Sequence, residues 1–267
     1  MWISLRSHWP EYLMEGAELG IFMLVASGFA TVLYAPASPA SQWLLPTFWR
    51  GALMGALVGI TAIAIIYSPW GKRSGAHFNP AVTLAFYRLG KLTTWDALFY
   101  VLAQFIGGAL GIFLAAQILG DAFTNLPVNY IVTVPGSWGW LGALIAEALL
   151  AFGLMAMVLV ISNHPKLHPL TGVCAGILVA LFITLAAPIS GMSINPARTF
   201  ASALAANVWT AFWIYYLMPP LAMLAAAEVY QHMTQRRSRE ICGKLCPNRE
   251  TRCICTTCPC MDDPDQQ

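Results

Sequence analysis

Six long, uninterrupted apolar stretches constrain the fold of this chain more than any other feature of its sequence. A transmembrane helix needs about 17–25 predominantly apolar residues, and each stretch meets that length. The apolar residues do not alternate with polar ones, which disfavours a transmembrane β-barrel. The sequence therefore predicts an all-α membrane protein with six transmembrane helices. These cover residues 12–34, 51–67, 97–119, 140–162, 170–189 and 208–230.

The charged residues are too few for a water-soluble surface. They make up 10% of the 267 residues, whereas soluble domains carry about 25%. The formal net charge of +2 disfavours a nucleic-acid partner. The apolar stretches also show no nucleophile–base pair or phosphate-binding loop that would indicate an enzyme. We expect the chain to be surrounded by membrane lipid, with no nucleic-acid partner and no catalytic activity.

Lysine and arginine are placed asymmetrically around the spans, and such residues are enriched in cytoplasmic loops. The loops at residues 35–49 and 120–139 contain neither, and Arg50 is an exception at that end. The other basic residues, Arg198 apart, fall on one side if both termini are cytoplasmic. We therefore expect a multi-pass protein of a plasma or inner membrane with this orientation. The residues that indicate it are Lys72, Arg73, Arg88, Lys91, Lys166, Arg236, Arg237 and Arg239.

Two short apolar segments, at residues 80–89 and 196–207, each begin with an Asn-Pro-Ala triplet. An Ala-Glu pair also opens both the first and the fourth span, at Glu18 and Glu147. Because three spans separate the two copies, the second copy must cross the membrane in the opposite direction. The sequence thus predicts two re-entrant half-helices in an inverted repeat, with passage expected where they meet. The repeat halves lie at about 12–119 and 140–230, within a channel domain at 1–230 that precedes a tail at 231–267.

The triplets specify where each half-helix begins. Asn is a favoured N-cap, and Pro is favoured at the first helical position. Ten to twelve helical residues rise roughly 15–18 Å, about half of the ~30 Å hydrocarbon core. Two such helices entering from opposite faces would meet by their N-termini, which each carry about +0.5 of an elementary charge. Asn79 and Asn195 are therefore predicted to form the pore midpoint, where cations are disfavoured.

Arg198 lies in the first turn of the second half-helix, in an otherwise uncharged segment. The equivalent place in the first half is Val82. An arginine inside a membrane is costly and by default functional. A bland alternative is an arginine whose side chain extends to the surface. We favour a fixed cation beside the lumen that repels cations and donates hydrogen bonds to solute oxygens.

The two motifs resemble those of the major intrinsic protein family, the aquaporins and glycerol facilitators. SGAHFNPAVT at residues 74–83 is similar to the first family motif, and GMSINPAR at 191–198 is similar to the second. Glu18, Glu147 and Gln104 also match family positions. The resemblance covers about residues 12–230. It implies six tilted helices plus two half-helices, and a homotetramer with one pore in each protomer.

The resemblance also implies a selectivity constriction outside the paired asparagines. Carried over, it consists of Arg198, Met192, Ile183 and a span-two position that is either Val58 or Gly59. Such a ring is apolar on three sides and wide on one, which favours glycerol, urea, ammonia or metalloid hydroxides alongside water. Three features are closer to the water-channel pattern and leave the solute open. They are Thr199 in place of the Asp of glycerol facilitators, Ala203, and the pair Tyr215-Tyr216.

The buried carboxylates allow a second interpretation of the function. Glu18 and Glu147 could relay protons in a coupled secondary transporter, or could accept hydrogen bonds from the re-entrant loops. We favour loop support, since it explains one Glu per repeat, and hence a passive channel without a cofactor in the pore. A structural membrane protein with a nearly closed pore is a third possibility. His77 is expected to line the cytoplasmic vestibule and to brace its loop.

The tail contains six of the seven cysteines. Disulfides are rare in the cytosol, and thiolates bind soft metals. The spacing matches no zinc template closely, and a redox-buffered or lipid-carrying tail is an alternative. The sequence predicts that thiolates of the tail bind a metal or metalloid. The candidate ligands are Cys242, Cys246, Cys253, Cys255, Cys258 and Cys260.

Overall fold

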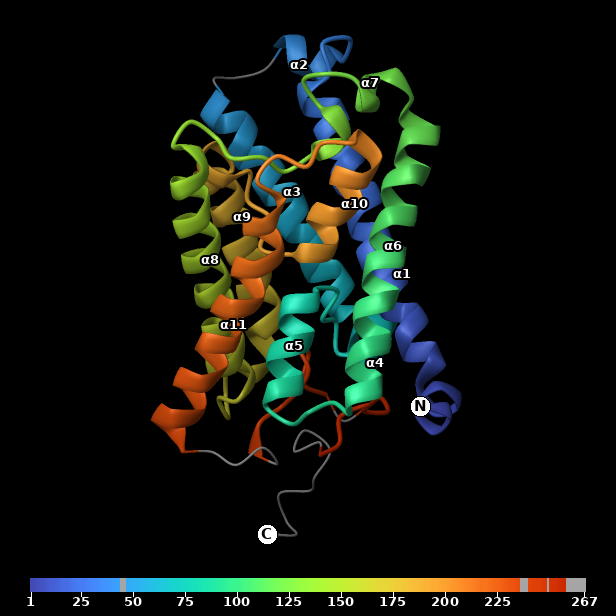
Figure 1. Cartoon of the computed structure of the whole chain (residues 1–267), viewed down its shortest axis with the longest axis vertical. Helices are drawn as coiled ribbons and strands as arrows, with labels where there is room; N and C mark the ends of the chain where they lie inside the picture. The colour runs from blue at the N-terminus through green and yellow to red at the C-terminus, as the bar shows by residue number, and fades with distance from the viewer. Residues whose placement is uncertain (44–46, 236–239, 249, 258–267) are drawn as a thin grey trace.

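The structure is a computed structural model that describes residues 1–43, 47–235, 240–248 and 250–257. Six long helices run side by side through the molecule, and no strand occurs in these ranges (Figure 1). All six are long and apolar enough to cross a membrane, which confirms the predicted fold class. They are α1 (Trp2–Tyr34), α3 (Thr47–Tyr67), α6 (Thr94–Leu119), α8 (Gly139–Ser162), α9 (Thr171–Ser190) and α11 (Phe212–Thr234).

The largest boundary difference lies in α1, which begins ten residues before the predicted span. Hydropathy marks only the part that suits lipid, whereas helical hydrogen bonding continues beyond the hydrocarbon core. Two contacts with α6 fix the polar start of α1. Asp96 Oδ1 accepts hydrogen bonds from the Tyr12 hydroxyl at 2.6 Å and from the His8 ring at 2.8 Å.

The two triplets begin two half-helices, as predicted. These are α5 (Pro80–Arg88) and α10 (Pro196–Ala206). Both start in the middle of the molecule and run to opposite ends of it (Figure 1). The remaining helices are short connections: α2 (Pro39–Trp43), α4 (Pro69–Ser74), α7 (Asp121–Thr124), and the 3-10 turns η1 (Asn129–Ile131) and η2 (His168–Leu170).

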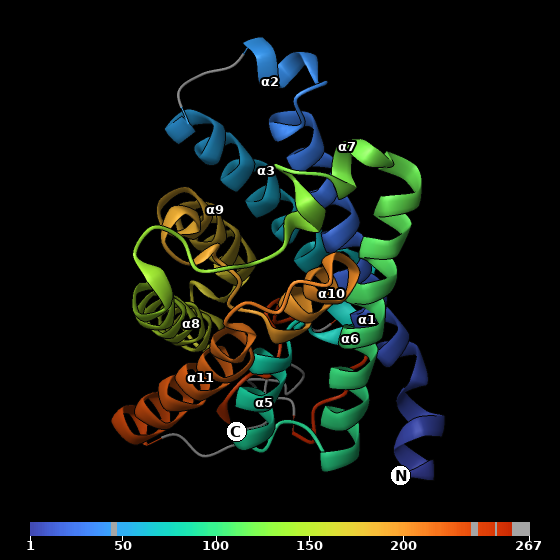
Figure 2. The ribbon, with the colours of Figure 1, turned by 45° about the horizontal axis from the view of Figure 1, so that its top comes forward.

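The helix contacts follow the inverted repeat. The most extensive contacts pair α1 with α6 and α8 with α11, which are the first and third spans of each half, while α3 pairs with α9 across the halves. Each half-helix packs mainly on the third span of the other half, α5 on α11 and α10 on α6 (Figure 2). The two repeats are thus interlocked around the centre.

Glycines allow the helices to approach closely, as is common in membrane bundles. A Cβ added to Gly107 of α6 would lie 1.9 Å from the Gly16 carbonyl oxygen of α1. A Cβ added to Gly59 of α3 would lie 2.5 Å from the Gly176 carbonyl oxygen of α9. Any side chain at these positions would force the helices apart.

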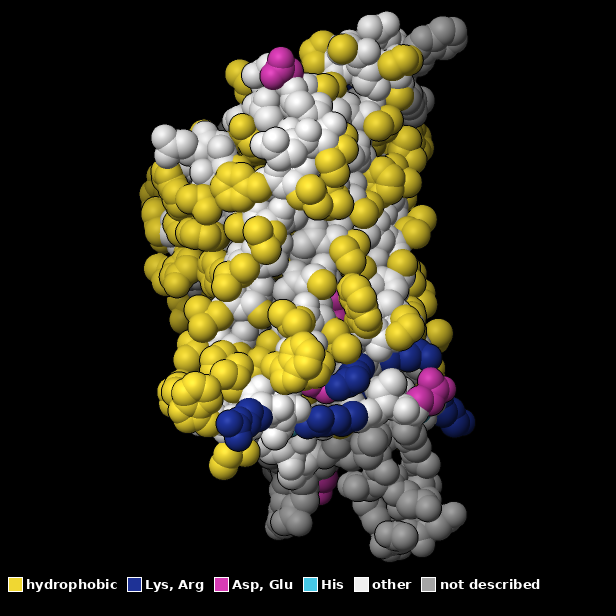
Figure 3. All heavy atoms as spheres, turned by 90° about the vertical axis from the view of Figure 1, so that its right-hand side faces the viewer, with side chains coloured by type: hydrophobic (Ala, Val, Ile, Leu, Met, Phe, Trp, Pro, Cys, Tyr) yellow, Lys and Arg dark blue, Asp and Glu magenta, His cyan; other side chains and the backbone are white. Residues whose placement is uncertain are grey.

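The outer surface has an apolar belt with basic residues at one end. Figure 3 shows hydrophobic side chains over the height of the spans and Lys and Arg gathered below them, on the face that it draws. This is the end where α1 begins, where α5 ends and where the described tail residues lie (Figure 1). We call it the tail end of the molecule.

Candidate pore and its lining

A cavity of about 390 Å³ runs through the centre of the helix bundle. Five residues of α3 line it, spaced three or four apart, so the cavity follows one face of that helix for about 22 Å. Further lining comes from α1, α9 and both re-entrant loops. The α3 residues are Gly51, Met54, Val58, Ala62 and Ile66.

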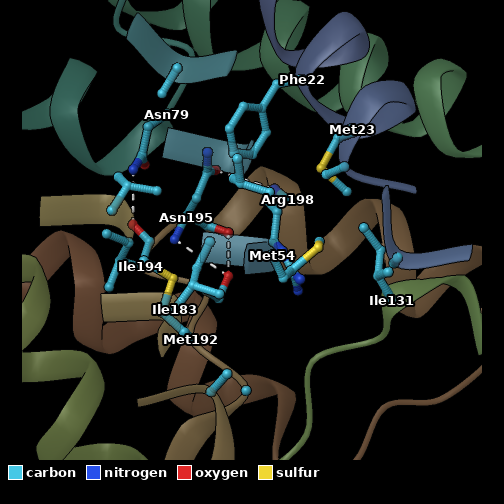
Figure 4. A pocket seen from close by; sticks show the side chains of 18 of the residues that line it. Phe22, Met23, Met54, Asn79, Ile131, Ile183, Met192, Ile194, Asn195 and Arg198 are labelled. Atoms are coloured by element: carbon cyan, nitrogen blue, oxygen red, sulfur yellow. Dashed lines mark hydrogen bonds between the residues drawn. The ribbon is translucent and has the colours of Figure 1, made fainter. Parts of the chain in front are cut away.

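The half-helices meet at the cavity through their capping asparagines. Asn79 Oδ1 accepts a hydrogen bond from Ala81 N at 2.9 Å, and Asn195 Oδ1 accepts from Ala197 N at 3.1 Å. Each amide nitrogen reaches across to the other repeat. Asn79 Nδ2 donates to the Ile194 carbonyl at 2.8 Å, and Asn195 Nδ2 donates to the Phe78 carbonyl at 2.9 Å (Figure 4).

These reciprocal bonds make the two asparagines one structural unit. Both line the cavity and are almost fully buried. One hydrogen of each NH2 group is used between the repeats, which leaves the second hydrogen for the lumen. The positive ends of two helices face the same point, so a cation passing there meets an unfavourable potential. A neutral molecule can replace a hydrogen bond to water by one from an asparagine NH2 group.

The loops before both half-helices have a matched, strained backbone. Ala76 and Phe78 have φ of 54° and 28°, and the equivalent Met192 and Ile194 have φ of 45° and 47°. Such left-handed conformations cost about 1–3 kcal/mol each for residues with a side chain and persist only where surrounding groups hold them. The alternation turns successive peptide groups in opposite directions, which is how the Phe78 and Ile194 carbonyls come to face the opposite asparagine.

A buried carboxylate holds the second loop in this shape. Glu147 Oε1 accepts hydrogen bonds from Ser193 N at 2.9 Å and from Ser190 Oγ at 2.8 Å. Its Oε2 accepts from Ile194 N at 2.6 Å. These contacts are those of loop support and leave no oxygen of Glu147 without a partner. They favour a passive channel over the proton relay of a coupled transporter.

In the first repeat the two loop amides are bound by Glu15, which was not among the predicted residues. Glu15 accepts from His77 N at 2.8 Å and from Phe78 N at 2.7 Å, the same two positions before the asparagine. Glu18, which the sequence analysis matched to Glu147, accepts only from Ser74 Oγ, at 2.9 Å. Ser74 and Ser190 both lie five residues before the capping asparagine, so Glu18 makes the contact that Glu147 makes with Ser190 Oγ. In the first repeat, Glu15 and Glu18, one helical turn apart, thus share the contacts that Glu147 makes alone.

Arg198 lines the cavity one turn into α10. Its backbone N donates to Asn195 Oδ1 at 3.2 Å. Its Nη1 is buried and has no hydrogen-bond partner among the described residues. A buried donor without a partner is costly. Arg198 therefore offers a free hydrogen-bond donor and a fixed positive charge to whatever occupies the lumen (Figure 4).

The other candidates for the constriction separate into lining and non-lining residues. Ile183, Met192 and Val58 all line the cavity together with Arg198. Gly59 is not among the lining residues, because it faces α9 at the close crossing with Gly176. Met54, one turn before Val58, also lines the cavity and was missed. Its spacing of four residues from Val58 was the signal that could have identified it.

His77 faces the cavity and also contacts its own half-helix. It lines the cavity, and its ring stacks on Phe86 with centroids 4.8 Å apart. Its Nδ1 lies 3.2 Å from Thr83 Oγ1, within α5. Its Nε2 donates to the carbonyl of Gly243 in the tail at 3.0 Å. The vestibule histidine is thus bonded to the tail, a contact that the sequence did not indicate.

The described tail cysteines are in two states. Cys242 and Cys253 are disulfide-bonded, which differs from the free thiolates that we expected, because spacing along the chain does not report which sulfurs folding brings together. Cys246 and Cys255 are free, and burial raises the pKa of both thiols. Cys258 and Cys260 lie outside the described residues. Within the described part, no group of three or more potential ligands could hold a metal, and the tail metal site stays a prediction.

Six apolar spans around a lined cavity, with two half-helices meeting at its centre, define this molecule as a membrane channel. The family model named Major intrinsic protein matches residues 6–230. The chain belongs to that family, and it is a passive channel for water and small uncharged solutes.

Individual relatives agree with this assignment. The chain is 34% identical over 187 residues to a protein named "Probable aquaporin NIP-type" from Nicotiana alata, which covers 68% of this chain and 67% of the relative. It is 34% identical over 189 residues to "Probable aquaporin AqpM" from Archaeoglobus fulgidus, covering 68% of this chain and 76% of the relative. The solved structure of the aquaglyceroporin from Plasmodium falciparum has the same fold, with a TM-score of 0.68 at 18% identity, over 85% of this chain and 97% of that one.

Proposed function

We propose that the channel conducts a small polar solute of the glycerol, urea, ammonia or metalloid-hydroxide type in addition to water. The observation that carries this proposal is the composition of the lining near Arg198. Ile183, Met192, Val58 and Met54 present only apolar groups to the cavity. A water molecule finds few hydrogen-bond partners on such walls. A solute with CH groups can place them there.

Arg198 supplies the polar side of the same passage. Its unpartnered Nη1 can donate to a hydroxyl or carbonyl oxygen of the solute. A molecule with one polar and one apolar face is therefore matched to both sides of the lining. Its charge, together with the two helix N-termini, opposes cations along the same path.

Stopped-flow light scattering on reconstituted liposomes tests this proposal. We expect entry of at least one non-water solute when water, glycerol, urea and arsenite are compared, with no accumulation against a gradient. The measurement includes a chain that ends at Thr234, so that any effect of the tail is separated from solute selectivity. A channel that passes water and excludes every other solute, with and without the tail, contradicts the proposal.

We further propose that the tail end faces the cytoplasm, so that both termini lie on that side. The support is the positive charge of that end. By their elements, the described basic residues there are Arg6, Lys72, Arg73, Arg88, Lys91, Lys166, Lys244 and Arg252, whereas Arg50 lies in the first turn of α3 near the opposite end (Figure 1). Arg236, Arg237 and Arg239 lie outside the described residues. Fusion of a reporter enzyme that is active only outside the cytoplasm, after residue 235, should give no activity.

We also propose a homotetramer with one pore in each protomer, in a plasma or inner membrane. The pore is enclosed within a single chain, so assembly is not needed to form it. Large apolar side chains cover the outer faces of the spans and suit either lipid or neighbouring copies. Native mass spectrometry of the detergent-solubilised protein should show four copies. A stable monomer would contradict this assembly.

A further inference from the structure

Part of the tail is packed against the membrane domain. Residues 241–246, which we call the tail segment, are all buried against the end of the bundle. Ile241, Leu245 and Cys246 belong to the same apolar cluster as Ile66 and Leu154 of the spans. We propose that the tail segment closes the tail-end mouth of the pore and holds the full chain in an autoinhibited state.

Leu245 is the residue that enters the pore. It lines the same cavity as the paired asparagines and is 5% exposed. It belongs to the same buried apolar cluster as Ile66 and Val82, which line the cavity from α3 and α5. Its backbone N donates to the Gly75 carbonyl at 3.0 Å. An apolar side chain within the apolar part of the lining excludes water, as hydrophobic constrictions do in gated channels.

The polar group at this mouth is also taken by the tail. The Gly243 carbonyl accepts the hydrogen bond of His77 Nε2. A passing solute would otherwise meet this ring nitrogen in the vestibule. The tail segment therefore replaces the solute in two ways, by filling the apolar part of the mouth and by using its donor.

Buried contacts on both repeats hold the segment in place. In the second repeat, Asn163 Oδ1 accepts from Cys242 N at 2.8 Å. In the first, Lys244 is 0% exposed and its Nζ donates to the Lys72 carbonyl at 2.9 Å. Within the tail, the same Nζ donates to the Arg252 carbonyl at 3.1 Å. A buried ammonium is retained only where such acceptors surround it.

The fit around Gly243 leaves no room for a side chain. A Cβ added there would lie 2.6 Å from Cys255 Sγ and 3.0 Å from Lys91 Cβ. The ion pair between Lys72 and Glu250, by contrast, is largely exposed, with 72% of the Glu250 side chain accessible. Exposed pairs contribute little. The buried contacts of the tail segment are therefore the ones that hold it in the mouth of the pore.

The test compares the water permeability of reconstituted full chain with that of three variants. A chain ending at Thr234 removes the tail, and Leu245→Ser keeps the tail but places a hydroxyl in the mouth. Arg252→Ala is the matched control, because its side chain is exposed and only its carbonyl contacts Lys244. We expect about a tenfold or larger increase per channel for the first two, as for a shift of one closed–open equilibrium, and no change for Arg252→Ala.

A second readout does not depend on flux. Cys246 is buried, and burial raises the pKa of its thiol, so maleimide labelling in the full chain should be slow. Leu245→Ser should speed labelling at Cys246, and Gly243→Val should act in the same direction. Labelling is compared in a chain where Cys174, Cys255, Cys258 and Cys260 are replaced by Ser.

The outcomes separate this inference from the solute proposal. Equal permeability of the full chain and the shortened chain, whether high or absent, would overturn the tail as a plug. Faster water flow after removal of the tail supports the plug even if glycerol, urea and arsenite stay excluded. That last result would contradict only the proposed solute class.

Discussion

The two re-entrant halves share their centre and differ at their ends. Each has an Asn cap, a left-handed loop and a glutamate that accepts the two amides before the cap. Beyond the centre, α10 carries Arg198 where α5 carries Val82, and the loop before α5 is hydrogen-bonded to the tail at His77 and Gly75. We therefore expect both halves to contribute to one barrier against cations, Arg198 to select by charge at one end, and the tail segment to cover the other end.

The glutamates should produce the largest effect, because they hold the shared part. Glu147→Ala leaves two loop amides and the Ser190 hydroxyl without acceptors, which should cost about 3 kcal/mol or more of folding stability. Glu15→Ala should be similarly damaging. Thermal unfolding in detergent and the yield of dispersed protein measure this effect.

Glu18→Ala is the control for that comparison. It removes the acceptor of one hydroxyl only, Ser74 Oγ, so its effect should be smaller. If Glu18→Ala were as damaging as Glu15→Ala, the two amide contacts of Glu15 would not be the main support of the first loop.

The paired asparagines should produce the next largest effect. Asn79→Asp together with Asn195→Asp adds two carboxylates where two helix N-termini meet, and removes both reciprocal Nδ2 bonds. Cation and proton leakage should rise more than after removal of one positive charge. A pH-sensitive dye inside liposomes measures the leak, with each single variant alongside. Intact exclusion in the double variant would show that the helix ends are not the barrier.

Arg198→Val makes the second half resemble the first. Removing a unit charge about 5 Å from a passing cation at an effective dielectric of 20 lowers its barrier by about 3 kcal/mol. Cation leakage should therefore rise, and glycerol and urea should enter faster because the lining becomes wider. Arg50→Val is a control, since Arg50 is not among the cavity-lining residues. Unchanged leakage in Arg198→Val would place its charge outside the conducting path.

Ile183→His should produce the smallest effect, a change of selectivity without loss of the fold. A ring nitrogen on the lining gives water a hydrogen-bond partner and narrows the passage. The ratio of water to glycerol permeability should rise by about tenfold, since a single lining contact changes discrimination by about 1–3 kcal/mol. The same stopped-flow assay measures both rates. An unaltered ratio would mean that Ile183 does not face the narrow part of the path.

The sequence predicted the elements well where short-range rules act. Apolar length identified six spans, and Asn-Pro located the start of both half-helices to the residue. The sequence was less able to predict which of two nearby residues on a helix faces the site. Glu15 and Glu18 differ by one helical turn, and Val58 and Gly59 by one residue. Only packing shows that Glu15 meets the loop amides, and that Gly59 faces α9.

The sequence by itself determined three features: membrane insertion, the inverted repeat and the paired helix starts. These features depend on apolar length and on local capping. The docking of the tail on His77 and Gly75 was decided by the tertiary structure alone. Those contacts join residues more than 160 positions apart, and no local pattern reports such a pairing. It arises from shape, from buried hydrogen bonds and from the apolar fit of Leu245, which exist only after the bundle has formed.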